Sequence, residues 1–175
     1  MEVYECIRSR RTVRQYKPDP VPESVIMKIL RAGRWAPSSS NSQPWNFVVV
    51  TNADTIAKLA EVATQGAFIA QAPLVIAILM SPGAPRPQLD AGRALQQMEL
   101  VAWDEGLGTC FVGVRAEEQQ VGVKEVLGIP PDFHLITLMP YGYRTGLPSG
   151  RPSVPRKPME EIAHRERFGN PYVSG

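Results

Sequence analysis

The sequence predicts a layered α+β or α/β fold, and three observations lead to this prediction. Short segments that are β-branched or continuously apolar, as strands are, occur at 46–51, 74–80, 109–114 and 133–142. Segments with apolar residues at helical spacing lie between them. Strands and helices therefore alternate, which favours helices layered on a sheet over a helical bundle or an all-β sandwich. The whole chain, 1–175, is expected to form one domain with a single core.

The helices are expected at 3–10, 22–36, 53–63, 90–106, 116–128 and 159–164. Pro22 stands in the opening turn of the second, where its missing N–H costs nothing, and Gly128 ends the fifth. The fourth is apolar over so much of its surface that we expect it to be central and partly covered by another subunit. Residues 140–158 contain five prolines, which predicts an extended strap.

Composition excludes several classes of function. The formal net charge is only +2, so the overall field does not favour nucleic acid or a membrane surface as a partner. The run from Ala72 to Met80 is far shorter than the ~20 residues that a membrane helix needs. The start, MEVYECIRSR, has no apolar core, so we expect no signal peptide. Cys6 and Cys110 form no disulfide framework, and the chain suits a reducing cytoplasm.

Common catalytic centres are not predicted. Cys110 stands in an apolar segment, where a buried inert thiol is the expected state. His134 and His164 have no second ligand at zinc spacing, so no metal site is expected. GLGTC lacks the third glycine of a dinucleotide fingerprint, and no GxSxG elbow occurs.

Two polar segments remain as candidates for ligand binding. RSRRTVR, at residues 8–14, reads either as a solvated helix end or as a phosphate site, since arginine forks and a hydroxyl suit a phosphate. WAPSSSNSQPWNF, at residues 35–47, reads either as a polar loop or as a ligand wall, because its tryptophans would bury its ends. With a glycine at a strand end and the late Arg156, these segments suit a ligand with a phosphate and a polar heterocycle.

Five motifs in this order resemble the nitroreductase family of FMN-dependent oxidoreductases over essentially the whole chain. They are RRTVRQY, APSSSNSQPW, APLVI, EGLGTCFVG and PRKPMEEI. The resemblance implies a nitroreductase-like fold, with a mixed, mostly antiparallel central sheet flanked by helices. It also implies a homodimer in which a C-terminal extension reaches the partner subunit.

The resemblance assigns FMN-binding residues. It places the FMN phosphate and the pyrimidine edge near Arg10, Arg11, Thr12 and Arg14. It brings a second motif from the partner subunit, formed by Pro37, Ser38, Ser39 and Asn41. By the same resemblance, the amide of Gln65 is expected near the flavin ring, and the backbone N–H groups of Gly113 and Val114 are expected to face flavin N5 and O4. The late phosphate ligand is expected to be Arg156, with Arg151 and Lys157 as alternatives.

The activity implied is ping-pong hydride transfer from NAD(P)H, through tightly bound FMN, to a small acceptor such as a nitroaromatic, a quinone or a flavin. No catalytic side chain or proton donor is assigned. Nine residues, SPGAPRPQL, stand where larger family members insert a helical excursion, so an open pocket is expected. The alternatives are a flavin-storage protein without turnover, or a specialised branch such as flavin fragmentation or dehalogenation. The sequence leaves the acceptor and the choice between NADH and NADPH open.

Overall fold

The computed structural model describes residues 1–146 and 155–172. Within them, the centre is a four-stranded sheet in the order β1-β2-β4-β3. Its strands are β1 (Trp45–Val50), β2 (Leu74–Met80), β3 (Leu107–Thr109) and β4 (His134–Tyr143). Neighbouring strands are antiparallel, and an isolated parallel bridge joins Thr12 to Thr109. The prediction of a layered fold with a mostly antiparallel sheet is confirmed.

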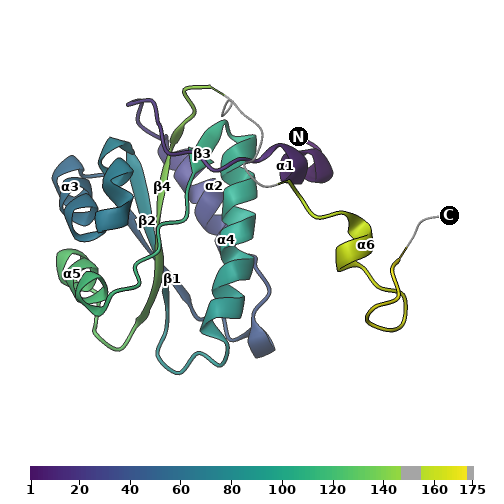
Figure 1. Cartoon of the computed structure of the whole chain (residues 1–175). Helices are drawn as coiled ribbons and strands as arrows, with labels where there is room; N and C mark the ends of the chain where they lie inside the picture. The colour runs from purple at the N-terminus through teal and green to yellow at the C-terminus, as the bar shows by residue number, and fades with distance from the viewer. Residues whose placement is uncertain (147–154, 173–175) are drawn as a thin grey trace.

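Helices cover both faces of the sheet (Figure 1). One face carries α2 (Glu23–Arg34) and α4 (Pro87–Asp104), and the other carries α3 (Ala53–Val62), the 3-10 helix η2 (Thr64–Gln71) and α5 (Glu117–Leu127). The residues of β2 alternate between the two cores. Leu74, Ile76 and Ile78 pack with α2 and α4, whereas Val75, Ala77 and Leu79 pack with α3 and α5. A strand buried on both faces has to be apolar throughout, which explains the continuous run in the sequence.

Three short helices of the described residues lie outside these layers. The N-terminal helix α1 (Val3–Ser9) packs against α4. The 3-10 helix η1 (Ser39–Asn41) lies in the serine run. The last, α6 (Met159–Ile162), projects from the layered body with the residues that follow it (Figure 1).

Local signals set several helix ends, and the one at Gly128 was predicted. The side chain of Asn52 accepts a hydrogen bond of 3.0 Å from the N–H of Thr55 and caps α3. Gly128 closes α5 in the left-handed conformation, with φ of 64°. The helix α4 begins at Pro87, three residues before the predicted start, because proline suits the first helical turn.

The predicted strand at 109–114 is wrong in its bounds, because β3 ends at Thr109. Beyond that residue, β4 makes a single isolated bridge, in which the N–H of Val112 donates to the carbonyl of Leu138 at 3.1 Å. Pro140 lies two residues after Leu138 and therefore on the same edge of β4, and it has no N–H to offer. The proline interrupts the ladder, and among residues 110–114 only Val112 bridges β4.

One further expectation needs correction. The extended strap does not begin at residue 140, since β4 continues to Tyr143; residues 147–154 of the strap lie outside the described residues. That another subunit partly covers α4 stays a prediction, because Leu100 and Val101 are only half-buried; Leu95, Met98 and Trp103 are already buried within one chain. Their burial against α2, the sheet and α1 makes α4 central, as predicted.

Candidate flavin site

The loop that follows α1 lies across β3 and β4, and two facing glycines make room for it. Gly108 and Gly142 are register partners in the ladder. A methyl group on Gly108 would lie 2.5 Å from the Cβ of Val13, and one on Gly142 would lie 2.7 Å from the Cβ of Tyr16. Glycine at both positions therefore permits this close approach. The packing anchors the chain on either side of Arg14.

The side chain of Arg14 is exposed and lies near two other elements. Its guanidinium carbon is 5.8 Å from the centre of the Phe68 ring in η2. It is also near Cys110, just beyond β3. Burial raises the pKa of the Cys110 thiol, and Arg14 lowers that pKa to a smaller extent. The thiol is therefore protonated at neutral pH, as expected of an inert cysteine.

The other residues of the basic motif have different surroundings. The Nε of Arg10 lies 3.6 Å from a carboxylate oxygen of Glu99, which leaves both Nη groups available to a second acceptor. Burial raises the pKa of Glu99, and Arg10 opposes this shift. The Nη1 of Arg11 donates to the carbonyls of Arg8 and Arg10 at the end of α1, at 2.7 and 3.0 Å. Thr12 is exposed beside them.

The segment after β3 offers two backbone donors. Val112 anchors it through its own N–H and through its carbonyl, which accepts a hydrogen bond of 2.8 Å from the hydroxyl of Thr137. The N–H groups of the next two residues, Gly113 and Val114, have no hydrogen-bond partner within the part of the chain that the structure describes. Most backbone donors in folded proteins are paired, so two adjacent unpaired N–H groups suit the acceptor atoms of a ligand.

The serine run is held by a buried carboxylate. The N–H of Ser39 donates to both oxygens of Asp90, at 3.1 and 3.2 Å, and its hydroxyl lies 3.3 Å from one of them. Asp90 is fully buried in the first turn of α4 and also lies 3.4 Å from Arg93. A buried charge needs such partners, so this contact fixes the loop on α4.

The backbone of the serine run is unusual. Ser40, Asn41 and Gln43 have φ of 52°, 53° and 49°, a region that favours glycine. The hydroxyl of Ser38 accepts a hydrogen bond of 2.9 Å from the N–H of Gln43, which stabilises this turn. Strained backbone at several adjacent non-glycine residues is typical of functional loops.

The two main parts of the predicted site do not meet within one chain. Ser39 is bonded to Asp90, whereas Arg10 is paired with Glu99, nine positions further along α4. A helix rises 1.5 Å per residue, so these anchor points are about 13 Å apart. The serine run and the basic loop are thus held at different heights along α4.

The remaining predicted residues lie in less informative places. Gln65 belongs to η2, next to the neighbourhood of Arg14, but its side chain lies outside the described part of the structure. Arg151 also lies outside it. Arg156 and Lys157 are exposed and precede α6, so the choice of a late phosphate ligand stays open.

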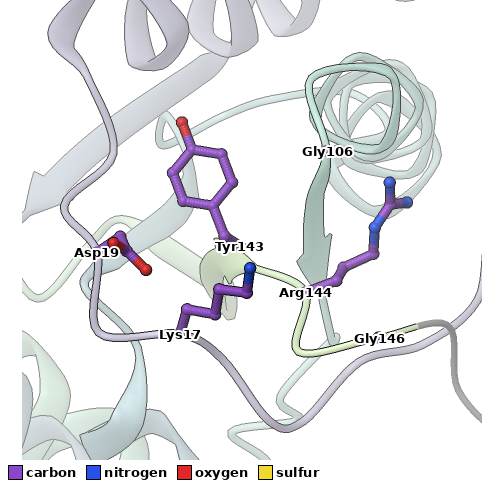
Figure 2. Close-up of a pocket in the computed structure, with 6 residues that line it drawn as sticks. All are labelled: Lys17, Asp19, Gly106, Tyr143, Arg144 and Gly146. Atoms are coloured by element: carbon purple, nitrogen blue, oxygen red, sulfur yellow. The ribbon is translucent and has the colours of Figure 1, made fainter.

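Two surface cavities lie near the site without coinciding with it. One, of about 540 Å³, opens at the start of β3, and none of the predicted site residues lines it (Figure 2). There the Lys17 side chain points toward Tyr143, whereas the guanidinium of Arg144 turns away and stacks on Trp103, 3.8 Å from its ring centre. The other, of about 490 Å³, lies between Pro37 and the exposed face of α4.

The described residues offer neither a metal site nor a membrane-spanning helix. Within residues 1–146 and 155–172, no group of three His, Cys, Asp or Glu side chains could hold a metal ion. His134 is exposed at the start of β4, and His164 packs on Phe168 with 4.5 Å between ring centres. The helices in these ranges include none that is long and apolar enough to span a membrane.

Sequence reasoning missed three residues around the site. Asp90 looked like an ordinary acidic residue at a helix start, although its contact with Ser39 holds the serine run. Glu99 is one of several polar residues on α4. A polar residue beside the apolar face of a helix signals a buried partner. Phe68 lies under Arg14 because η2 turns back toward the sheet, and no sequence signal indicates that turn.

Comparison with known proteins agrees with this geometry. The model of the nitroreductase family matches residues 7–76 and 62–143. The fold is that of a solved protein of Parabacteroides distasonis, described as a candidate NADH dehydrogenase/NAD(P)H nitroreductase, with a TM-score of 0.86, 25% identity and coverage of 95% of this chain and 98% of that one. Fold and site thus define a nitroreductase-fold protein. The chain belongs to the nitroreductase family.

Other similar proteins suggest the range of activities in this family. A candidate NADH dehydrogenase/NAD(P)H nitroreductase of Methanothermobacter thermautotrophicus is 34% identical over 86% of this chain and 82% of its own length. The solved FMN-dependent nitroreductase of Clostridium difficile has a TM-score of 0.80 and 26% identity, covering 93% of this chain and 98% of that one. An iodotyrosine deiodinase of Nematostella vectensis is 26% identical over 92% of this chain and 74% of its own length.

Proposed function

We propose that the protein is an FMN-dependent oxidoreductase that passes electrons from NAD(P)H to a small acceptor such as a nitroaromatic, a quinone or a free flavin. Family membership and the FMN-dependent relative support this proposal. When bound, FMN would supply the redox chemistry, because it accepts a hydride and gives up the electrons again. The protein would supply binding, orientation and charge.

One observation carries the proposal. Among the described residues, the N–H groups of Gly113 and Val114, just beyond β3, are unpaired, and the side chain of Arg14 lies near Cys110 in the same segment. A flavin ring has hydrogen-bond acceptors along one edge and gains negative charge when it is reduced. Two fixed N–H donors and one guanidinium suit such an edge, because preorganised donors stabilise developing charge. The residues present therefore fit FMN.

The basic loop and the end of the chain would hold the phosphate. Arg10 is oriented by Glu99 through Nε, so that both Nη groups can bind phosphate oxygens. Thr12 adds a hydroxyl donor, and Arg156 is proposed as the late cation. Arg11 would contribute less, because its Nη1 already bonds the end of α1. Gln65 is proposed to contact the ring.

We propose that the second wall of the site comes from another copy of the chain in a homodimer. The anchor points of Ser39 and Arg10 are about 13 Å apart on α4, which supports a site shared between subunits. The proposed second wall is formed by Pro37, Ser38, Ser39 and Asn41. The location in the cytoplasm remains a prediction from the two unpaired cysteines.

The proposal is tested by adding NAD(P)H anaerobically to the purified protein. We expect bound FMN in about one copy per chain and rapid loss of its absorbance near 450 nm, followed by recovery when a quinone or nitroaromatic is added. A flavin-storage protein would keep its absorbance, and a protein without FMN would contradict the proposal outright.

Kinetics test the order of the reaction. If donor and acceptor enter the same opening in turn, double-reciprocal plots are parallel, and intersecting plots would exclude a shared opening. No side chain is assigned as a proton donor, and the buried Cys110 thiol is protonated across the neutral range, so we expect no bell-shaped pH profile for flavin reduction.

Similarity to a deiodinase favours a second candidate, reductive removal of iodide from an aromatic substrate. Assaying iodide release from 3-iodotyrosine with the reduced protein would decide between the candidates. No release, with rapid oxidation by quinones, is expected from the leading proposal.

A further inference from the structure

The segment after β3 presents an unusual outward face. Cys110, Val112 and Val114 point into the core and are 3–4% exposed. The residues between and after them alternate to the outside: Phe111 is 50% exposed, Gly113 is half-buried and Arg115 is exposed. The anchoring of Val112 to β4 by both its backbone groups fixes this alternation.

Phe111 and Arg115 flank Gly113 closely. A methyl group at Gly113 would lie 3.7 Å from Cε1 of Phe111 and 3.4 Å from Nε of Arg115. The ring and the guanidinium thus stand on the same side of the segment, on either side of the bare glycine backbone. Among the described residues, Arg115 has neither an ion pair nor a hydrogen bond in the structure, so its charge is available to a ligand.

An aromatic ring, a free cation and a bare backbone on one face match a particular kind of molecule. The ring offers a surface for stacking of another planar ring. The guanidinium binds a carboxylate, sulfonate or phosphate by charge-assisted hydrogen bonds. Both groups adjoin the Gly113 and Val114 donors that we assign to FMN, so a molecule held by them would lie beside the proposed reaction centre.

We propose that Phe111 and Arg115 select the electron acceptor and favour a planar aromatic molecule that carries an acidic group. This inference rests on the proposed function, because it assumes that electrons leave the protein near Gly113. Arg115 distinguishes anionic from neutral acceptors. Phe111 contributes to binding of aromatic acceptors of either charge.

The first experiment measures binding alone. Benzoate and benzyl alcohol, which accept no electrons here, are titrated into oxidised holoenzyme by calorimetry. We expect Arg115→Gln to raise the Kd of benzoate about fivefold, as loss of an exposed ion pair does, and to leave that of benzyl alcohol unchanged. Phe111→Ala should weaken both ligands. Arg31→Gln, an exposed arginine in the last turn of α2, is the matched control and should change neither.

The second experiment measures turnover with 4-nitrobenzoate and 4-nitrobenzyl alcohol. In this half-reaction the reduced flavin, with protons from solvent, supplies the two electrons and two protons that convert each nitro group to nitroso with release of water. Holoenzyme is first photoreduced, so that the donor is absent, and is then mixed with the acceptor. Arg115→Gln should lower the preference for the anionic acceptor about fivefold through apparent affinity rather than the limiting rate, and added salt should reduce the preference in the parent protein.

Several results would overturn the inference. An unchanged ratio between the two acceptors in Arg115→Gln, with normal bleaching by NAD(P)H, would refute it and leave the proposed function intact. Loss of FMN from either variant would show that these residues hold the cofactor instead. A raised KM for NAD(P)H alone would assign Arg115 to the donor. A parent protein that NAD(P)H does not bleach would refute the proposed function itself.

Discussion

Arg14 lies near Cys110 in the segment that carries the proposed flavin donors, and it is exposed, so its removal should affect binding more than folding. We predict that Arg14→Ala raises the Kd for FMN by about one to two decades, because a hydrogen bond to a charged group contributes about 1.5–3 kcal/mol. Quenching of flavin fluorescence measures this affinity. The thermal midpoint of the apoprotein should stay within about 2 °C of the parent, since an exposed side chain contributes little to stability.

A variant that keeps its flavin through dilution and gel filtration would show that Arg14 does not bind FMN. Arg31→Ala is the control, because that residue is exposed on α2, in the layer across the sheet from Cys110 and Phe68.

Glu99 predicts a pH dependence of stability. Burial raises its pKa in the folded state above that of an unfolded carboxyl. The folded state therefore binds the proton more tightly, and this contribution to stability is present below the ordinary pKa and lost as pH rises through the raised one. We expect Glu99→Gln, which cannot ionise, to be as stable as the parent near pH 4 and increasingly more stable above it. Thermal midpoints at several pH values measure this difference. A constant difference would mean that Arg10 offsets the burial of the charge completely.

At the scale of secondary-structure elements, the facing glycines of β3 and β4 decide where the basic loop lies. We predict that Gly108→Ala lowers the free energy of unfolding by about 1–3 kcal/mol, since its methyl group would lie 2.5 Å from Val13 and force the loop outward. The displaced loop carries Arg14, so affinity for FMN should fall as well. Urea denaturation and flavin titration provide the two measurements.

Gly146 supplies the matched control for this change. A methyl group there would meet no atom of the described residues within 4 Å, and its φ is not in the left-handed region. Gly146→Ala should therefore stay within about 0.5 kcal/mol of the parent. Equal effects of the two substitutions would show that the close approach at Gly108 does not constrain the loop.

At the scale of the whole molecule, we predict a homodimer that shares two FMN sites. Several large apolar side chains are exposed in the single chain, on α1 and around α6: Tyr4 is 72% exposed, Ile162 56% and Phe168 94%. Such residues commonly mark surfaces that are buried in assembly. Sedimentation velocity should give a dimer with one FMN per chain, and Ile162→Asp should release monomer and flavin together. A monomer that retains stoichiometric FMN would contradict the shared site.

The sequence was sufficient for features that depend on local chemistry. The continuous apolar run of β2 predicted a strand buried on both faces, and Gly128 marked a helix end through its backbone preference. It also indicated the layered fold, because alternating strands and helices allow few other arrangements. The motif order indicated the family. None of these inferences requires knowledge of which distant residues meet.

The tertiary structure decided what depends on distant contacts. The strand expected at 109–114 stops at Thr109 because Pro140, on the neighbouring strand, lacks an N–H at that edge. The serine run is tied to Asp90 and the basic loop to Glu99, which separates them along α4. A sequence pattern reports the preferences of one segment. These contacts form only when the sheet and α4 bring together residues about 30 to 90 positions apart, and neither partner alone specifies them.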